Sequence, residues 1–185
     1  DELRNEVEGN QVTGSLCIKF PWPSIARTIW GDHQRYKETY FTAFPGKYFT
    51  GDGALRDEVG YYRITGRVDD VIIVSGHNLG TAPIEDAINE HPAIAESAIV
   101  GYPHDIKGYA LYGFVILKDT GAYRDQSNLR KEINQLITDQ IGPIAKLDKI
   151  QFVSGLPKTR SGKIMRRILR KIASDDAENL GDIST

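Results

Sequence analysis

The spacing of apolar residues changes several times along the chain, and each change predicts a different element. Residues 12–20 read as a strand, and residues 48–74 have a β-type composition. Within that second region, Asp57–Gly60 and Thr65-Gly66 are the residues expected to form turns. The intervening stretch 32–37 is polar. The first third of the chain is therefore predicted to be rich in β-structure.

Helical spacing begins near residue 81. Thr81 is the expected N-cap, Pro83 lies in the first turn, and Pro92 ends this helix. The remaining pattern predicts strands at 72–74, 97–100, 113–117 and 150–153, and helices over 129–137 and 164–172. The order from residue 70 is β-α-β-β-α-β-α. This order predicts a small α+β domain whose helices pack on a mixed sheet.

The composition is that of a globular protein: 40% of the 185 residues are hydrophobic and 26% are charged. No apolar run approaches the roughly 20 residues that a membrane-spanning helix needs, so we expect no membrane association. Cys17 is the sole cysteine, which excludes an internal disulfide and fits a reducing, cytoplasmic location. The chain starts at Asp1 and its sole methionine is Met165, so we expect it to be a fragment of a longer protein.

The histidines are too dispersed to predict a metal site or a catalytic triad. They occur at positions 33, 77, 91 and 104, with none of the spacings that bind zinc. We therefore expect no metal ligands in this chain.

Positive charge gathers in residues 158–171, which hold seven cations and no carboxylate. Because the whole chain has a formal net charge of −2, the rest of it sums to −9. One interpretation is an amphipathic helix with a solvated cationic face. The other is an anion site, because Lys163 follows a loop with two hydroxyls and a glycine at the predicted entry to a helix.

Two more specific interpretations of the cationic segment fail. A Walker phosphate loop has four residues between its glycines and a hydroxyl residue after the lysine, whereas six residues separate Gly155 from Gly162 and Ile164 follows Lys163. Nucleic-acid binding is not expected, since the remainder is acidic and no aromatic residue lies among the cations.

Two acidic positions in the β-rich region have both a structural and a functional interpretation. Asp52 lies between two glycines, which indicates either a simple turn or a carboxylate that a ribose could approach. The pair Asp69-Asp70 follows Arg67, and its simplest interpretation is a salt-bridged loop.

Taken together, three segments resemble the C-terminal part of the acyl-adenylate-forming enzymes, and most closely their acetyl-CoA synthetase branch. The segments are YFTGDGA at 48–54, YYRITGRVDDVIIVSGHNLG at 61–80 and LPKTRSGKIMRRILRKIA at 156–173. Residues 22–36 and 179–185 also resemble that branch, so the resemblance covers the chain. It implies an AMP-forming ligase in which ATP and acetate give acetyl-adenylate and pyrophosphate, and CoA then displaces AMP.

The resemblance also implies a division of the chain. Residues 1–68 would end a large N-terminal domain, residues 69–70 would form a hinge, and residues 71–185 would be a small mobile C-terminal domain. Most of the nucleotide and acyl pockets would lie in the missing part, so this chain alone is expected to be inactive. ATP and CoA would be substrates, with Mg²⁺ accompanying ATP.

For the adenylation site, the resemblance implies roles for four residues. Lys163 would be catalytic, contacting the acetate carboxylate and the α-phosphate and offsetting charge as the carboxylate attacks phosphorus. A lysine acetyltransferase and deacetylase acting on Lys163 are implied partners. Asp52 would bind the ribose hydroxyls, Arg67 would assist at the nucleotide, and Asp69 would be the pivot of the hinge.

For CoA, the resemblance implies that Ser75, Gly76 and His77 face the thiol tunnel, where Gly76 leaves room for pantetheine. Two positions depart from the family pattern. Asn78 and Thr138 stand where family members often have phosphate-binding arginines. Two alternatives stay open: a propionyl-CoA or other short-chain acyl-CoA synthetase, and a non-catalytic binding module with a basic helix.

Overall fold

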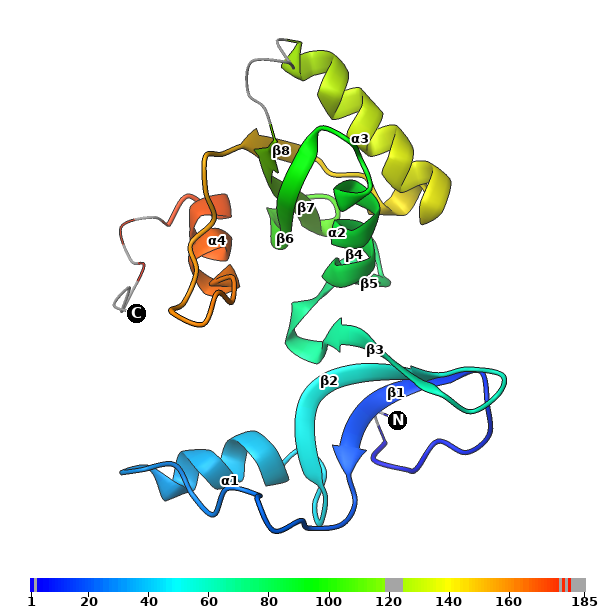
Figure 1. The fold of residues 1–185 in the computed structure, drawn as a ribbon, viewed down its shortest axis with the longest axis vertical. Helices are drawn as coiled ribbons and strands as arrows, with labels where there is room; N and C mark the ends of the chain where they lie inside the picture. The colour runs from blue at the N-terminus through cyan, green and yellow to red at the C-terminus, as the bar shows by residue number, and fades with distance from the viewer. Residues whose placement is uncertain (2, 119–124, 177, 179, 181–185) are drawn as a thin grey trace. The chain divides into compact units, whose positions relative to one another are not determined.

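The computed structural model describes residues 1, 3–118, 125–176, 178 and 180. The chain divides into two compact units, residues 1–69 and residues 70–185, and each is described by itself. Figure 1 shows the elements of both units along the chain.

Unit 1 contains an antiparallel sheet of three strands in the order β1-β2-β3, formed by Val12–Ile18, Tyr48–Arg56 and Tyr62–Arg67. A helix, α1 (His33–Phe41), lies between β1 and β2 in sequence. The sequence pattern showed residues 32–37 to be polar and did not predict this helix. The helix forms because the Asp32 side chain caps it, accepting a hydrogen bond from the Arg35 amide at 2.9 Å, and because Tyr36 is buried.

One of the two predicted turns in unit 1 is confirmed, and the other is wrong. Asp57 Oδ1 accepts hydrogen bonds from three following amides, which closes the turn between β2 and β3. Thr65 and Gly66 instead lie inside β3. The register against β2 shifts between Gly53 and Ala54, so the Thr65-Gly66 pair forms a β-bulge.

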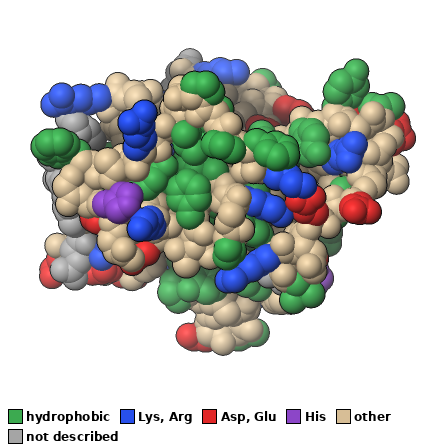
Figure 2. Space-filling model, turned by 90° about the horizontal axis from the view of Figure 1, so that it is seen from below, with side chains coloured by type: hydrophobic (Ala, Val, Ile, Leu, Met, Phe, Trp, Pro, Cys, Tyr) green, Lys and Arg blue, Asp and Glu red, His purple; other side chains and the backbone are tan. Residues whose placement is uncertain are grey.

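Unit 1 also exposes large apolar side chains, most completely that of Trp30, at 98%. Others are Leu3, Phe20, Tyr61 and Tyr62. Figure 2, which shows one side of the molecule, has hydrophobic side chains at the surface with lysines and arginines between them. Exposed apolar surface of this kind is typical of an interface.

Unit 2 confirms the predicted α+β architecture on a mixed sheet. The sheet runs β5-β4-β7-β6 in antiparallel pairs, and β8 adds to β7 in parallel. Its strands are β4 (Val71–Val74), β5 (His77–Gly80), β6 (Ile94–His104), β7 (Gly108–Leu117) and β8 (Lys149–Phe152). The helices are α2 (Thr81–Asn89), α3 (Gln126–Gln140) and α4 (Arg166–Ala173), with a 3₁₀ turn η2 (Pro143–Ala145); another 3₁₀ turn, η1 (Val68–Asp70), spans the boundary between the two units.

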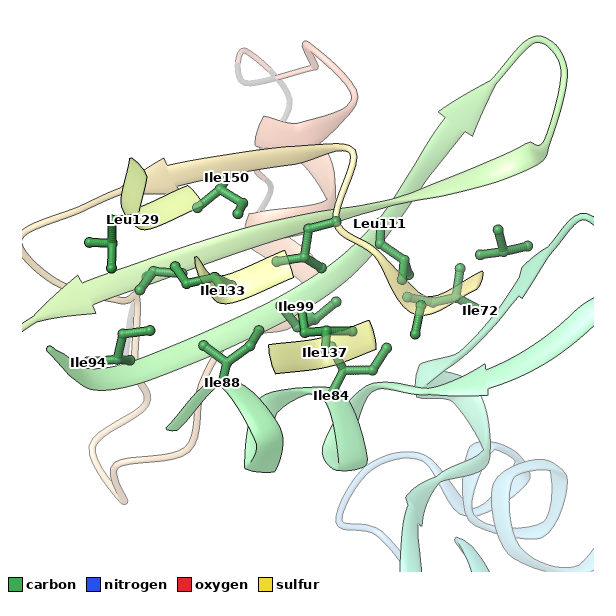
Figure 3. Packing of buried hydrophobic residues seen from close by; sticks show 14 of the residues in the cluster. Ile72, Ile84, Ile88, Ile94, Ile99, Leu111, Leu129, Ile133, Ile137 and Ile150 are labelled. Carbon is green, nitrogen blue, oxygen red and sulfur yellow. The ribbon is translucent and has the colours of Figure 1, made fainter. Parts of the chain in front are cut away.

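Alternation along the long strands gives this sheet two buried faces. Ile99 of β6 and Leu111 of β7 pack with Ile84 of α2 and Ile133 of α3 in one cluster, as Figure 3 shows. Their neighbours in the strands face the other way and pack against α4, in a second cluster containing Ala98, Val100, Ala110, Phe114 and Leu169. The sheet of unit 2 is therefore covered by α2 and α3 on one side and by α4 on the other.

Several predicted boundaries in unit 2 change. Thr81 is the first residue of α2 rather than its cap, and the extended Gly80 takes the cap position. The final helix begins at Arg166, two residues later than predicted. Strand β5 was not predicted at all. It forms because Ser75 and Gly76 both have positive φ, 49° and 82°, which makes a tight two-residue hairpin turn from β4.

Candidate active site

Lys163 lies at the tip of a short hairpin, residues 157–165, which we call the Lys163 hairpin. Lys158 and Ile164 form an antiparallel bridge, and the Met165 amide donates to the Pro157 carbonyl at 2.8 Å. The turn is closed by the Gly162 amide, which donates to the Thr159 carbonyl at 2.9 Å. Gly162 has φ 82°, the left-handed conformation that glycine adopts without strain.

The loop forms a hairpin rather than the N-terminus of a helix, so the structure does not support its interpretation as an anion site at a helix terminus. The Thr159 hydroxyl accepts from the Lys163 amide at 3.2 Å and lies 2.9 Å from the Ser161 hydroxyl. The Gly162 and Lys163 amides and the Thr159 hydroxyl thus form hydrogen bonds within the turn. The cationic group that the turn presents is the Lys163 ammonium, three residues before α4.

The other cations of the segment differ from Lys163, whose exposed side chain has no hydrogen bond or ion pair with the residues that the structure describes. Lys158 pairs with Glu96 at 2.8 Å and Lys171 with Asp176 at 2.8 Å. The remaining partners are Glu85 and Asp70 for Arg166, Asp70 for Arg170 and the Leu180 carbonyl for Arg167.

The interpretation of the arginines as a solvated cationic face is therefore wrong for Arg166. The Arg166 side chain is only 21% exposed, and its Nη2 atom donates to both oxygens of Glu85, at 2.6 and 2.8 Å. Asp70 is 14% exposed and accepts a hydrogen bond from Arg170. Arg166 Nε lies 3.6 Å from Asp70 Oδ2, so one face of α4 packs into an acidic pair.

Burial shapes the electrostatics of this cluster. The pKa of the Glu85 carboxyl is raised above its ordinary value, chiefly because burial disfavours the charged form. The Ile99 amide and the Arg166 guanidinium act in the opposite direction, while the nearby Asp70 carboxylate adds to the rise.

In unit 1, the structure brings together three of the predicted site residues. Arg67 and Asp52 lie opposite each other in the β3–β2 register, with Nη1 3.6 Å from Oδ1. Arg67 Nε also donates to Asp69 Oδ1 at 2.9 Å, and its Nη1 donates to the Thr50 carbonyl at 3.0 Å. The expected salt bridge between Arg67 and the following acidic pair is therefore present at Asp69.

The glycines beside Asp52 have a structural explanation. A Cβ atom on Gly51 would lie 2.5 Å from the Arg67 guanidinium nitrogens, and one on Gly53 would lie 2.8 Å from the Thr65 hydroxyl. The space next to these glycines is filled by side chains of β3. In this structure that space is therefore occupied and Asp52 is half-buried beside Arg67, while the approach of a ligand to Asp52 stays a prediction.

The four predicted CoA and phosphate contacts at residues 75–78 lie at the β4–β5 turn, and all are exposed. The Ser75 amide donates to the Lys107 carbonyl at 3.1 Å, and His77 Nδ1 lies 3.2 Å from the Ser75 carbonyl. A Cβ on Gly76 would meet open space, so its positive φ is what favours glycine there. Asn78 pairs with Ile73 across the hairpin.

Thr138, the other position that departs from the family pattern, lies near the C-terminal end of α3. Its hydroxyl donates to the Asn134 carbonyl at 2.7 Å, one turn earlier. The structure places Thr138 and the β4–β5 turn on separate elements of unit 2.

Comparison with known families and structures identifies the domain. A known family profile matches the chain from α2 to the tip of the Lys163 hairpin. Residues 83–163 match the AMP-binding enzyme C-terminal domain family. Lys163 is the last residue of that match.

The similarity to named proteins extends beyond this AMP-binding enzyme C-terminal domain. The chain is 59% identical over 184 residues to an acetyl-coenzyme A synthetase of Parvibaculum lavamentivorans and 56% identical over 185 residues to the human protein named acetyl-coenzyme A synthetase 2-like, mitochondrial. Each alignment covers 100% of this chain but 28% and 27% of the relative. The predicted resemblance is confirmed, and the chain spans little more than a quarter of these relatives.

Solved structures agree with the fold. The anthranilate CoA ligase AuaEII, crystallised with anthranoyl-AMP, matches with a TM-score of 0.80 and 27% identity over 95% of this chain and 33% of its own. ATP-bound MatB from Rhodopseudomonas palustris matches with a TM-score of 0.75 and 26% identity, over 92% of this chain and 32% of its own. The α+β fold of this chain is that of a segment in adenylate-forming enzymes.

Sequence reasoning missed Glu85 and left Asp70 without a specific role. Glu85 lies on α2 between buried apolar positions, where it looks like an ordinary helix residue. The sequence signal that could have singled it out is a carboxylate placed next to Ile84 and three residues before Ile88, close to the apolar face of the helix, since a carboxylate that becomes buried needs a partner.

Proposed function

We propose that this chain is the C-terminal part of an AMP-forming acetyl-CoA synthetase. The supporting observation is Lys163, an exposed ammonium without an ion pair among the described residues, held at the tip of a hairpin in a domain of the AMP-binding family. Such a group can approach two anions together, the acetate carboxylate and the α-phosphate of ATP. Its charge would offset the negative charge that develops as carboxylate oxygen attacks phosphorus.

The proposed reaction has two steps. The carboxylate oxygen of acetate bonds to the α-phosphorus and pyrophosphate leaves, which gives acetyl-adenylate. The CoA thiol then attacks the acyl carbon, its proton is lost to solvent, and AMP leaves. ATP and CoA are substrates in this scheme, and Mg²⁺ enters with ATP. Among the described residues, no group of three potential ligands is placed to hold a metal ion.

We propose that unit 1 ends the large N-terminal domain and that residues 69–70 form the hinge. The exposed apolar side chains of unit 1, Trp30 above all, support this because a larger domain would cover them. Asp52 would accept hydrogen bonds from the ribose hydroxyls, and Arg67 would hold that carboxylate in place while adding positive charge near the nucleotide.

We propose that the β4–β5 turn serves the second step. Ser75, Gly76 and His77 are exposed at a turn with a defined conformation, which suits a surface that receives pantetheine. Asn78 would replace an arginine at a phosphate contact, and Thr138 would replace another near CoA.

Acylation of Lys163 by an acetyltransferase, reversed by a deacetylase, is a further part of the proposal. The exposure of Lys163 at a hairpin tip makes its amine accessible to an enzyme, and acylation would remove the charge. No helix among the described residues is long and apolar enough to cross a membrane. A cytoplasmic location remains our proposal, and cell fractionation would test it, since the human relative is named mitochondrial.

ATP–pyrophosphate exchange by the full-length protein tests the function. We expect exchange that depends on acetate and is weaker with propionate. Stronger exchange with propionate would favour the short-chain alternative instead. Absence of exchange with any short carboxylate would contradict the synthetase assignment and favour a binding module.

A further inference from the structure

Two ion pairs, one near each end of the Lys163 hairpin, join it to β6 and α2 of unit 2. On the N-terminal arm, Lys158 Nζ lies 2.8 Å from Glu96 Oε2 in β6. Just beyond the C-terminal arm, Arg166 Nη2 lies 2.6 Å from Glu85 Oε2 in α2. Lys163 lies between these two cations in the chain, and it has no such partner among the described residues.

The Glu85 carboxylate is itself fixed in place. Its Oε1 atom accepts from the Ile99 amide of β6 at 2.8 Å, as well as from Arg166. Strand β6 is at the edge of the sheet, so this amide would otherwise lack a strand partner. One buried carboxylate therefore joins α2, the edge of β6 and the first residue of α4.

The Arg166–Glu85 and Lys158–Glu96 ion pairs are expected to differ in strength because they differ in exposure to solvent. The side chains of Arg166 and Glu85 are 21% and 12% exposed, whereas those of Lys158 and Glu96 are 39% and 33% exposed. Solvent screens the more exposed pair and leaves it a small contribution. Breaking the more buried pair leaves an uncompensated charge, which is strongly unfavourable.

Asp70 provides a second contact for the same helix. It accepts a hydrogen bond from Arg170, one turn beyond Arg166 on the same face of α4, and lies 3.6 Å from Arg166 Nε. The start of α4 is thus held against two carboxylates from different elements. The last turn of the hairpin, which leads directly into α4, has little freedom to shift.

We infer that Arg166 and Glu85, assisted by Lys158 and Glu96, are positioning residues for Lys163. The inference rests on the proposed role of Lys163 in adenylation. None of the four residues needs to touch a substrate. They set where the hairpin tip lies on unit 2, and displacing a reacting group by about 1 Å can lower a rate about 100-fold.

Measuring the two half-reactions of the full-length synthetase separately distinguishes a loss of positioning at Lys163 from a general folding defect. Arg166→Met should lower acetate-dependent pyrophosphate exchange about 10- to 100-fold and leave thioester formation from supplied acetyl-adenylate within about threefold. Arg166→Lys keeps the charge but cannot bind both oxygens in the same way, so its exchange rate should be intermediate. Lys158→Met should cost less than about fivefold, as for an exposed pair.

Arg167→Met is the matched control, because it removes one cation from the same turn of α4 and leaves Glu85 paired. It should keep exchange near the wild-type rate. Equal losses of both half-reactions in Arg166→Met would indicate general damage and overturn the inference, as would unchanged exchange in that variant.

A measurement without activity uses the 185-residue chain. Hydrogen exchange at the Gly162 and Met165 amides, both bonded within the hairpin, should quicken in Arg166→Met while amides of α3 stay protected. Unchanged protection at those two amides would overturn the inference. If the wild-type synthetase shows no acetate-dependent exchange, the proposed function fails, and this measurement still decides whether the ion pairs hold the hairpin.

Discussion

Asp69 and Asp70 are adjacent in the chain, yet each binds an arginine of a different unit. Asp69 accepts from Arg67 in unit 1 at 2.9 Å, and Asp70 accepts from Arg170 in unit 2. Each carboxylate has an arginine partner within its own unit, which supports the proposed hinge at residues 69–70. Hinges of this kind need only a few residues whose φ and ψ can change.

Asp69→Pro should therefore slow thioester formation more than adenylation in the full-length enzyme. Proline fixes φ near −65° and would hold the link in one conformation. Asp69→Ala is the control, because it removes the Arg67 pair without restricting φ. Both half-reactions are measured separately. Unchanged rates in the proline variant would place the hinge elsewhere.

Lys163→Ala should lower acetate-dependent pyrophosphate exchange by at least about 100-fold, the scale of losing one charge-stabilising group. Thioester formation from supplied acetyl-adenylate should continue. Enzymatic or chemical acylation of Lys163 should have the same effect, since it removes the ammonium charge. Lys131→Ala, a change at another exposed lysine of unit 2, is the control. Equal loss of both half-reactions in the Lys163 variant would contradict the assigned role.

The 185-residue chain by itself should form no acetyl-CoA from ATP, acetate and CoA. It spans 28% of its relative from Parvibaculum lavamentivorans, and catalysis requires the reacting groups to be held together in one geometry. A coupled assay for AMP release checks this, with the full-length protein as the positive control. Turnover by the short chain above the buffer background would show that it holds a complete active site.

Thr138→Arg should lower the KM for CoA modestly, by up to about fivefold, as expected for an exposed phosphate contact. Pyrophosphate exchange should not change. Lys146 and Lys149 are the next lysines after Thr138 and could supply the missing positive charge. Lys149 already lies over the rings of Tyr102 and Tyr112, at 4.5 and 5.7 Å from their centroids. Lys146→Ala is therefore expected to weaken CoA binding more than Lys149→Ala. No response to any of the three changes would mean that unit 2 does not hold this phosphate.

The Glu85 carboxyl should make the stability of the chain depend on pH. Its folded pKa is raised above the ordinary value of 4.5, so the folded state binds more protons than the unfolded state between the two pKa values. The contribution of Glu85 to stability therefore falls as pH rises through that window. Urea unfolding should show wild type losing stability relative to Glu85→Gln as the pH rises above the ordinary value of 4.5.

Glu58→Gln, at the exposed β2–β3 turn, is the control for this effect. The opposite trend for Glu85→Gln, with wild type gaining stability as pH rises, would show that Arg166 outweighs burial. Either way, the ion pair that positions the hairpin need not stabilise the fold, since desolvation can exceed the attraction between buried charges.

Local order was predictable because it is encoded in neighbouring residues. The side chain of Asp57 and the backbone of Gly60 make one turn, and the apolar spacing of α2 and α3 follows from one buried helix face. The position of Lys163 after a hydroxyl-rich loop could also be read from the sequence. The resemblance to the family then implied a role for Lys163 in adenylation.

Contacts between distant residues were decided by the tertiary structure. Helix α1 buries Tyr36, the Arg67 side chain fills the space beside Gly51, and Arg166 binds a carboxylate 81 positions away. No local spacing reports such pairs, because each residue is an ordinary member of its own element until the fold brings its partner within hydrogen-bond distance. Sequence alone thus singled out the cation that we propose acts on substrate, and the packing of α4 against α2 and β6 provides the contacts that we propose hold it in place.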